Sequence, residues 1–389
     1  MLDKRYLTLV VVTAILASLI LLQGEKPSGE SFIGVCVKSY DSFSVLFDGN
    51  RTVLIDRNLD EGKLYLLRGR LRNSENRLWM DVSEVKALEV LPRWLQRVKG
   101  SYWVRNGNPY LIAPEWIKLS KPLAIEKGSI VEVSGIFYNG VFHPVKIQNS
   151  KQPTKELKSG FPAEIRGVVL SVSSPAVLWN GTTKIYLYLP YGTKLKLGEM
   201  VKVLGIVKIT SRINVYVDSK EDVNHLGYPN PVGINGSKTG DLVRGICKVT
   251  KPMKSGLRLN CTELRLLGFS ARTGDETEIL ALNTGSTLKC IDCRISRPRE
   301  SLPNSLCSFR EGETAKIRGR VSWVRRYSNG FSLANITSES CWVLLKLPKS
   351  LGVDVNTREV VTAYGTFVTY RGMPALQPWS GDDVCSGNC

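Results

Sequence analysis

The sequence predicts an all-β protein made of several small five-stranded barrels in tandem. Three observations carry this prediction: apolar residues alternate with polar ones over short stretches, Asn-Gly and Asp-Gly dipeptides separate these stretches, and a glycine recurs inside the same kind of stretch. Alternation with a period of two residues indicates a strand with one buried face, and Asn-Gly or Asp-Gly favours a tight hairpin. No segment beyond the amino terminus has the pattern of a long amphipathic helix.

The recurring glycine belongs to a repeated unit. A glycine, an alternating apolar run and a second glycine seven residues further on occur at 61–71, 127–137, 197–207 and 311–321, and a diverged copy at 357–368 keeps only the second glycine. A glycine inside a strand indicates a bulge or a sharp bend. Because a strand that bends at a fixed place in every repeat is typical of small closed barrels, we expect a chain of such barrels.

Each barrel is expected to hold five strands. In the first barrel these are residues 32–38, 43–47, 52–56, 63–71 and 78–86. The same count fits 163–218 and 314–377, whereas the second and the cysteine-rich fourth repeats show the pattern less clearly. The predicted barrels are residues 32–90, 91–150, 160–225, 239–300 and 312–380, followed by a Cys-containing tail at 381–389.

The amino terminus predicts a membrane anchor. Residues 6–22 carry no charge and follow Lys4 and Arg5. A helix of these 17 residues is about 25 Å long, enough to cross a thin hydrocarbon layer. Basic residues stay on the cytoplasmic side, which places the bulk of this single-pass chain outside. We therefore expect an uncleaved anchor at 1–24 and a tether at 25–31, because no small-residue cleavage site of a signal peptide follows the apolar run.

Two further features agree with an extracytoplasmic glycoprotein. Acceptor patterns for N-glycosylation occur at Asn50, Asn180, Asn235, Asn260 and Asn335. Eight of the nine cysteines lie beyond residue 240, at Cys247, Cys261, Cys290, Cys293, Cys307, Cys341, Cys385 and Cys389. Outside the cytoplasm such cysteines favour disulfides. A tetrahedral zinc site on Cys290, Cys293, Cys307 and one more thiol is the alternative, which is weaker because no second Cys-x-x-Cys follows. Cys36 is expected to be a small buried apolar side chain.

The opening strand of several repeats has a shared form, an apolar alternation with a glycine inside it. It occurs at 32–37, 164–169, 242–249 and 316–321, and a later strand carries Gly69, Gly135, Gly205 or Gly365. In these features the chain resembles the OB-fold, a five-stranded Greek-key barrel, and in particular exported or archaeal, membrane-anchored proteins with tandem OB-folds. SH3-like barrels and immunoglobulin-like sandwiches are the alternative folds. The resemblance implies binding of oligonucleotides or oligosaccharides on one barrel face and its flanking loops.

Candidate contacts for a single-stranded nucleic acid lie in the first and last barrels, because single strands need aromatic rings beside Lys or Arg. The candidates are Arg68, Arg70, Arg72, Arg77 and Trp79, and then Arg318, Arg320, Trp323, Arg325 and Tyr327. Alternate positions such as 68, 70 and 72 share one face of a strand. The net charge of +18 is spread along the chain rather than concentrated in one barrel. A solvated outer face with ordinary core tryptophans is therefore the alternative interpretation.

The sequence offers little material for catalysis. His143 and His225 are the only histidines, and no P-loop, nucleophile-elbow, zinc-protease or dinucleotide motif occurs. We expect no enzyme activity, no catalytic residues, no metal and no cofactor. The leading hypothesis is a non-enzymatic, extracytoplasmic protein that binds an extended polyanion, with single-stranded nucleic acid as the first candidate. The alternative is a surface scaffold or adhesion module that binds a protein or an envelope glycan. The sequence leaves the oligomeric state open.

Overall fold

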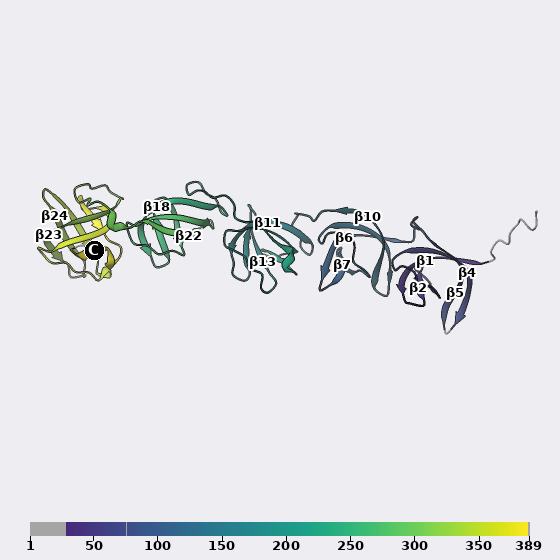
Figure 1. Ribbon diagram of the computed structural model, residues 1–389. Coiled ribbons are helices and arrows are strands. Elements are labelled where there is room, and N and C mark those ends of the chain that lie inside the picture. Colours follow the sequence, from purple (N-terminus) through teal and green to yellow (C-terminus); the bar gives the residue numbers. More distant parts are fainter. Residues whose placement is uncertain (1–28, 75, 388–389) are drawn as a thin grey trace, which may run out of the picture. The chain divides into compact units, whose positions relative to one another are not determined.

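The computed structural model describes residues 29–74 and 76–387, and these residues form strands with only short helical turns (Figure 1). The predicted all-β class and the small five-stranded barrels are confirmed. Within the described residues, no helix is long and apolar enough to cross a membrane. The predicted anchor at 6–22 lies outside the described residues. Contacts divide the chain into two compact units, with the boundary between Glu156 and Leu157.

The first unit holds barrels 1 and 2. Barrel 1 consists of β1 (Glu30–Ser39), β2 (Ser44–Phe47), β3 (Thr52–Ile55), β4 (Leu64–Ser74) and β5 (Arg77–Ala87). Barrel 2 consists of β6 (Gln96–Arg105), β7 (Asn108–Ile112), β8 (Trp116–Lys118), β9 (Ile130–Tyr138) and β10 (Val141–Lys151). The last two residues of the predicted tether, Glu30 and Ser31, already belong to β1.

The second unit holds barrels 3, 4 and 5. Barrel 3 consists of β11 (Pro162–Ser171), β12 (Ala176–Trp179), β13 (Lys184–Tyr188), β14 (Met200–Ile209), β15 (Ile213–Tyr216) and β16 (Val223–His225). Barrel 4 consists of β17 (Val232–Gly233), β18 (Leu242–Met253), β19 (Gly256–Leu259), β20 (Thr262–Leu267), β21 (Glu276–Asn283) and β22 (Thr287–Arg297). Barrel 5 consists of β23 (Thr314–Arg326), β24 (Ser332–Ser338), β25 (Cys341–Leu347), β26 (Val360–Tyr370), β27 (Met373–Gln377) and β28 (Val384–Ser386).

All five barrels share one strand order. In barrel 1 the order is β1-β2-β3-β5-β4, with β1 paired to β4 and β3 parallel to β5. The third and fifth strands are also parallel in barrels 3, 4 and 5, and in barrel 2 a parallel bridge between Leu119 and Phe142 takes this role. This is an OB-like five-stranded Greek-key barrel, repeated five times.

The strand glycines mark places where two backbones meet. A Cβ atom on Gly69 would lie 2.1 Å from the carbonyl oxygen of Asp81 on β5, next to a bulge at Ser83 of β5. One on Gly365 would lie 2.5 Å from the carbonyl oxygen of Gln377 on β27. The first glycine of the repeat serves a turn, and in the diverged copy Arg358 takes the left-handed conformation there, with φ of 72°. In four of the five copies the repeat therefore reflects the approach of the fourth strand to the fifth. The copy at 311–321 lies on the first strand of barrel 5, where Gly319 approaches the carbonyl of Thr337 on β24.

Barrels 3 and 5 carry an addition that follows the fifth strand. Short 3-10 turns, η1 (Lys220–Asp222) and η4 (Gly381–Asp383), lead into β16 and β28, which pair with the fourth strand. Each turn is preceded by a serine and ends in an aspartate that form a capping box. Most of the segment expected as a tail at 381–389 thus lies in η4 and β28. Two more turns, η2 (Arg299–Ser301) and η3 (Lys349–Leu351), complete the described elements.

Barrels 1 and 2 meet through the same faces as barrels 3 and 4. In the first unit, Val35 and Val37 on the outer face of β1 pack with Leu95 and Ile136 of barrel 2. In the second unit, Val168 and Leu170 on the outer face of β11 pack with Leu282 of barrel 4. The outer face of a first strand is thus covered by the fourth-strand side of the barrel that follows.

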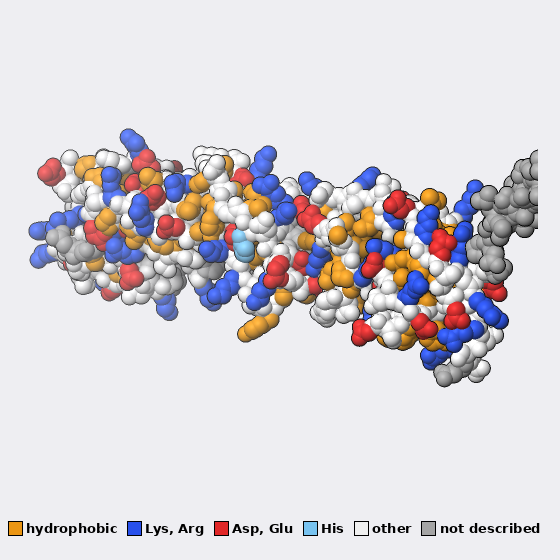
Figure 2. Space-filling model, turned by 45° about the vertical axis from the view of Figure 1, so that its right-hand side comes forward, with side chains coloured by type: hydrophobic (Ala, Val, Ile, Leu, Met, Phe, Trp, Pro, Cys, Tyr) orange, Lys and Arg blue, Asp and Glu red, His pale blue; other side chains and the backbone are white. Residues whose placement is uncertain are grey.

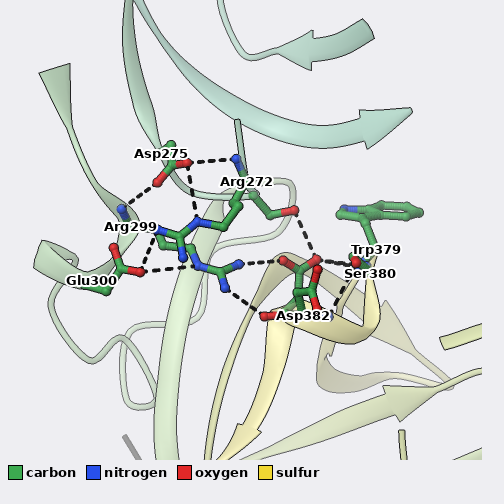
Figure 3. A network of polar contacts seen from close by, with 9 residues as sticks. Arg272, Asp275, Arg299, Glu300, Trp379, Ser380 and Asp382 are labelled. Atoms are coloured by element: carbon green, nitrogen blue, oxygen red, sulfur yellow. Dashed lines mark hydrogen bonds and ion pairs between the residues drawn. The ribbon is translucent and has the colours of Figure 1, made fainter. Parts of the chain in front are cut away.

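The junction between barrels 4 and 5 is polar (Figure 3). Arg299 is 3% exposed, and its Nη1 lies 2.8 Å from Oδ1 of Asp383, while its Nη2 donates to the carbonyl of Asp382. The backbone N–H groups of Arg272 and Arg299 both donate to the buried carboxylate of Asp275. A buried ion pair of this kind is strongly destabilising when one partner is removed, so it couples the two barrels.

The predicted use of cysteines in disulfides is confirmed. Cys247 pairs with Cys261, Cys290 with Cys293, and Cys307 with Cys341. Cys385 is also disulfide-bonded, and Cys389 lies outside the described residues. The three sulfurs of the alternative zinc site are therefore engaged in disulfides. Cys36 is a free thiol in the core of barrel 1, and burial raises its pKa to about 11.

Candidate nucleic-acid interface

The outer face of barrel 5 is open, unlike the equivalent face of barrels 1 and 3. Arg318 and Arg320 point outward from β23, opposite the buried Ile317 and Val321. A bulge between Val321 and Trp323 shifts the alternation by one residue. Trp323 therefore also points outward, and it is 43% exposed. Arg325 points in the same direction. Four of the predicted contacts, Arg318, Arg320, Trp323 and Arg325, thus share one face of β23.

Cross-strand register extends this face over β24 and β25. Arg320 lies opposite Thr337, which lies opposite Trp342, and this second tryptophan is 42% exposed. Three residues further along β23, beyond the bulge, Trp323 lies opposite Asn335. Rows of outward side chains in a strand are spaced by roughly 7 Å. Each of these two rows thus presents an exposed tryptophan, and Arg320 adds a cation to the first.

The rows lead to three aromatic rings in the loops at one end of barrel 5. The Tyr327 and Phe331 rings, which flank the loop between β23 and β24, have centroids 5.6 Å apart. The Phe331 ring lies 6.2 Å from that of Tyr370, at the end of β26. All three rings are half-buried, so part of each remains accessible. The link between these loops runs across the sheet, because β26 pairs with β27, β27 with β25, and β25 with β24.

Three cations lie over these rings. The Arg325 guanidinium is 5.3 Å from the centroid of Tyr327, and the Lys346 ammonium and Arg371 guanidinium are 5.5 and 5.6 Å from that of Tyr370. We call this set the barrel 5 cluster, and it comprises Arg325, Tyr327, Phe331, Lys346, Tyr370 and Arg371. In the described part of the chain, none of its three cations is in an ion pair with an acid. Arg326, by contrast, is held by Asp354 at 2.9 Å.

The predicted contacts in barrel 1 have a different environment. Arg68, Arg70 and Arg72 are exposed on one face of β4, as their spacing predicts. The strand opposite supplies acids: Arg68 pairs with Glu84 at 3.1 Å, and Arg72 pairs with Asp81 at 2.9 Å. Exposed pairs of this kind contribute little to stability, but they cancel charge. Residues 32–90 carry 9 basic and 9 acidic side chains, against 9 and 6 in residues 312–389.

Barrel 1 nevertheless has an aromatic cluster in the same place. The rings of Tyr40 and Phe43 are stacked with centroids 4.4 Å apart, and Trp79 is half-buried 6.1 Å from Phe43. Arg72 lies 5.6 Å from the Trp79 ring. A hydrogen bond with the Tyr40 side chain raises the pKa of Lys38. This barrel 1 cluster comprises Lys38, Tyr40, Phe43, Arg72 and Trp79. Arg77 is exposed at the start of β5, opposite Ser74.

The sequence contained a signal for both clusters, of which the predicted contacts include only Tyr327. The first hairpin of each barrel contains a tyrosine and a phenylalanine, Tyr40 with Phe43 and Tyr327 with Phe331. In both hairpins the tyrosine N–H donates to the phenylalanine carbonyl, over 2.8 and 2.9 Å. The predicted contacts do not include Trp342, Lys346, Tyr370 and Arg371, because these residues reach the outer face of barrel 5 only through strand pairing.

The five glycosylation candidates differ in accessibility. Asn50, Asn235 and Asn260 are exposed, and Asn180 is half-buried in a hairpin turn. Asn335 is also half-buried, and its Nδ2 donates to Ser322 Oγ over 2.8 Å. Because Asn335 lies within the outer face of barrel 5, a glycan there would cover that face.

The surroundings of the two histidines indicate structural roles. His143 is 7% exposed, and burial lowers its pKa. The Nδ1 atom of His225 lies 2.9 Å from Glu199 Oε1. Over residues 29–74 and 76–387, no group of three or more His, Cys, Asp or Glu side chains has the arrangement of a metal site.

The comparisons with known proteins add little to this geometry. No protein-family model matches the chain, and no curated protein is similar to it in sequence. A solved structure of a multidomain protein with nucleic acid binding domains from Streptococcus pneumoniae is similar over 56% of this chain and 73% of its own. The sequence identity is 10% and the TM-score 0.13, a value that carries no information about fold or function.

Proposed function

We propose that this protein binds an extended polyanion, and single-stranded nucleic acid in particular, on the open outer face of barrel 5. The observation that carries the proposal is the barrel 5 cluster, in which three accessible rings lie beside three cations that have no acid partner within the described residues. Bases stack on such rings whatever their sequence, at about 1–3 kcal/mol per base, while cations follow the phosphates.

The β-strands next to the barrel 5 cluster supply further contacts for the same single-stranded nucleic acid. Trp323 and Trp342 offer exposed rings, and Arg318 and Arg320 lie beside them on the same face. A single strand that crosses these rows would meet a cation or a ring at intervals of roughly 7 Å. Stacking and charge contacts of this kind need no chemical step, and so the proposal is binding alone.

We further propose that binding takes place outside the cytoplasm, on a chain anchored through residues 6–22. The disulfides of barrels 4 and 5 support this location, because such bonds persist mainly in oxidising compartments. The ligand would then be nucleic acid that enters, leaves or coats the cell.

Salt dependence of binding tests the proposal. Full-length protein in a non-ionic detergent is titrated into a fluorescent oligo-dT of about 20 nucleotides, long enough for at least one OB barrel. We expect the affinity to fall steeply between 50 and 200 mM salt, at roughly tenfold or more, as counterions are released. Tyr327→Ala with Tyr370→Ala should weaken binding about 10- to 100-fold. The absence of binding at low salt would refute the proposal.

An envelope glycan is the second candidate ligand. On the face drawn in Figure 2, Lys and Arg side chains are interspersed with Asp and Glu in both units, rather than gathered in one basic field. Mixed charge with exposed tryptophans also suits an acidic polysaccharide. Competition separates the two ligands: an acidic polysaccharide that displaces oligo-dT at equal charge concentration would favour the glycan.

A further inference from the structure

Barrel 3 carries a second aromatic surface with a cation above it. The rings of Tyr188 on β13 and Tyr216 on β15 are stacked, with centroids 4.7 Å apart and an interplanar angle of 11°. Arg212, in the turn between β14 and β15, lies 4.5 Å from the Tyr186 centroid and donates to the Tyr188 hydroxyl over 3.3 Å. We call Tyr186, Tyr188, Arg212 and Tyr216 the tyrosine platform.

The platform faces solvent and is held rigidly. Tyr216 is 39% exposed, and the Arg212 side chain is exposed with no acid partner in the residues that the structure describes. The turn that carries Arg212 is fixed from below by the buried Asn214, whose Nδ2 donates to three acceptors, including the carbonyls of Lys208 and Arg212. A fixed turn loses little conformational entropy when a ligand binds.

The position of the platform follows from the way barrel 3 is covered. In barrel 5 the open face lies on the first three strands, but in barrel 3 the outer face of the first strand is packed against barrel 4 through Val168 and Leu170. The third and fifth strands of barrel 3 stay free of that junction, and the tyrosines lie there. Barrel 4 has a single aromatic residue, Phe269, and this residue packs against the barrel core.

We propose that the tyrosine platform is a second binding site for the same single strand, so that barrels 3 and 5 bind one long ligand together while barrel 4 separates them. This inference rests on the proposed function of barrel 5. Bases stack on Tyr188 and Tyr216, and Arg212 contacts a phosphate. A second site on one strand raises affinity through effective concentration without any new contact at the first site.

The inference predicts that affinity depends on ligand length. A strand of about 8 nucleotides fits one barrel, whereas one of about 40 exceeds the site size of a single OB barrel. Full-length protein in detergent should bind the longer oligo-dT at least about 100-fold more tightly than the shorter one, by anisotropy. Arg212→Glu should remove most of that advantage and change binding of the short strand less than about twofold. Tyr188→Ala with Tyr216→Ala should do the same.

A matched control comes from barrel 4. Arg265 is an exposed arginine on the third strand of a barrel without a platform, and Arg265→Glu makes the same change of charge. If Arg265→Glu and Arg212→Glu reduce binding of the long strand equally, or if neither does, the inference is wrong while the proposed function of barrel 5 stands. If the short strand does not bind the wild-type protein at low salt, the proposed function itself fails.

Discussion

Barrels 1 and 5 both carry outward arginines and a cluster of aromatic rings, but the charge around these arginines differs between the two barrels. Both have outward arginines on a long strand and a tyrosine and phenylalanine in the first hairpin. In barrel 1, however, Glu84 and Asp81 face these arginines across the sheet, whereas no acid pairs with Arg318 or Arg320 in the described part of barrel 5. A row of arginines therefore indicates a polyanion site only where the opposite strand leaves the charge free.

A second contrast concerns the same strand position in barrels 3 and 5. Val168 and Arg320 both precede the bulge of the first strand, and each pairs with the second and fourth strands. Val168 is 8% exposed beneath barrel 4, whereas Arg320 is exposed. The same position is thus apolar where another barrel covers it and charged where it is exposed.

The largest expected effect on stability comes from giving barrel 3 the residue type that barrel 5 has at this position. Val168→Arg places an unpaired charge in an apolar junction and should lower the free energy of unfolding by about 3–5 kcal/mol. The reverse change, Arg320→Val, should stay within about 0.5 kcal/mol, because the site is exposed. Thermal unfolding followed by tryptophan fluorescence measures both. Equal stabilities of the two variants would show that the junction does not set the choice of residue.

Reduction of the disulfides should affect barrel 5 and leave barrel 1 unchanged. The Cys307–Cys341 disulfide closes a loop over a sequence separation of 34 residues, which corresponds to about 3–4 kcal/mol in the chain-entropy model. Barrel 1 has only the free Cys36. A reducing agent should thus lower protection against hydrogen exchange in barrel 5 and leave that of barrel 1 unchanged. Equal loss in both barrels would contradict this view.

Reversing an arginine in each barrel compares their contributions to binding. Arg325→Glu changes a cation of the barrel 5 cluster and should weaken oligo-dT binding about tenfold, within the range for a phosphate contact beside a stacked ring. Arg68→Glu in barrel 1 should change it less than about twofold, since Glu84 already cancels that charge. Fluorescence anisotropy at one low salt concentration gives both values. A larger loss from Arg68→Glu would assign the ligand to barrel 1.

The smallest expected effect is a gain. Glu84→Gln with Asp81→Asn frees the arginines of barrel 1 without changing side-chain volume much. Because exposed ion pairs contribute at most about 1 kcal/mol, stability should hardly change. Affinity for oligo-dT should rise about two- to fivefold if charge alone separates the two aromatic clusters. Unchanged affinity would mean that the Tyr40–Phe43–Trp79 surface itself does not accept a base.

Local patterns in the sequence were sufficient to predict the strands and the barrels. Alternation and hairpin dipeptides depend on neighbours in the chain, and they placed the strands of barrels 1, 3 and 5 within a few residues. The outward direction of Arg68, Arg70 and Arg72 followed from the two-residue period alone. The clustering of cysteines likewise predicted disulfides in the last two barrels.

Only the tertiary structure decided which surfaces are free. Strand register set Glu84 against Arg68 and placed Trp342 in the same row as Arg320, and register depends on bulges and loops that the pattern does not specify. The covering of Val168 by barrel 4 depends on a partner more than a hundred residues further along the chain. The sequence by itself thus determined which residues form strands and which way they point, whereas charge neutralisation and burial arise from contacts between strands and barrels distant in the chain.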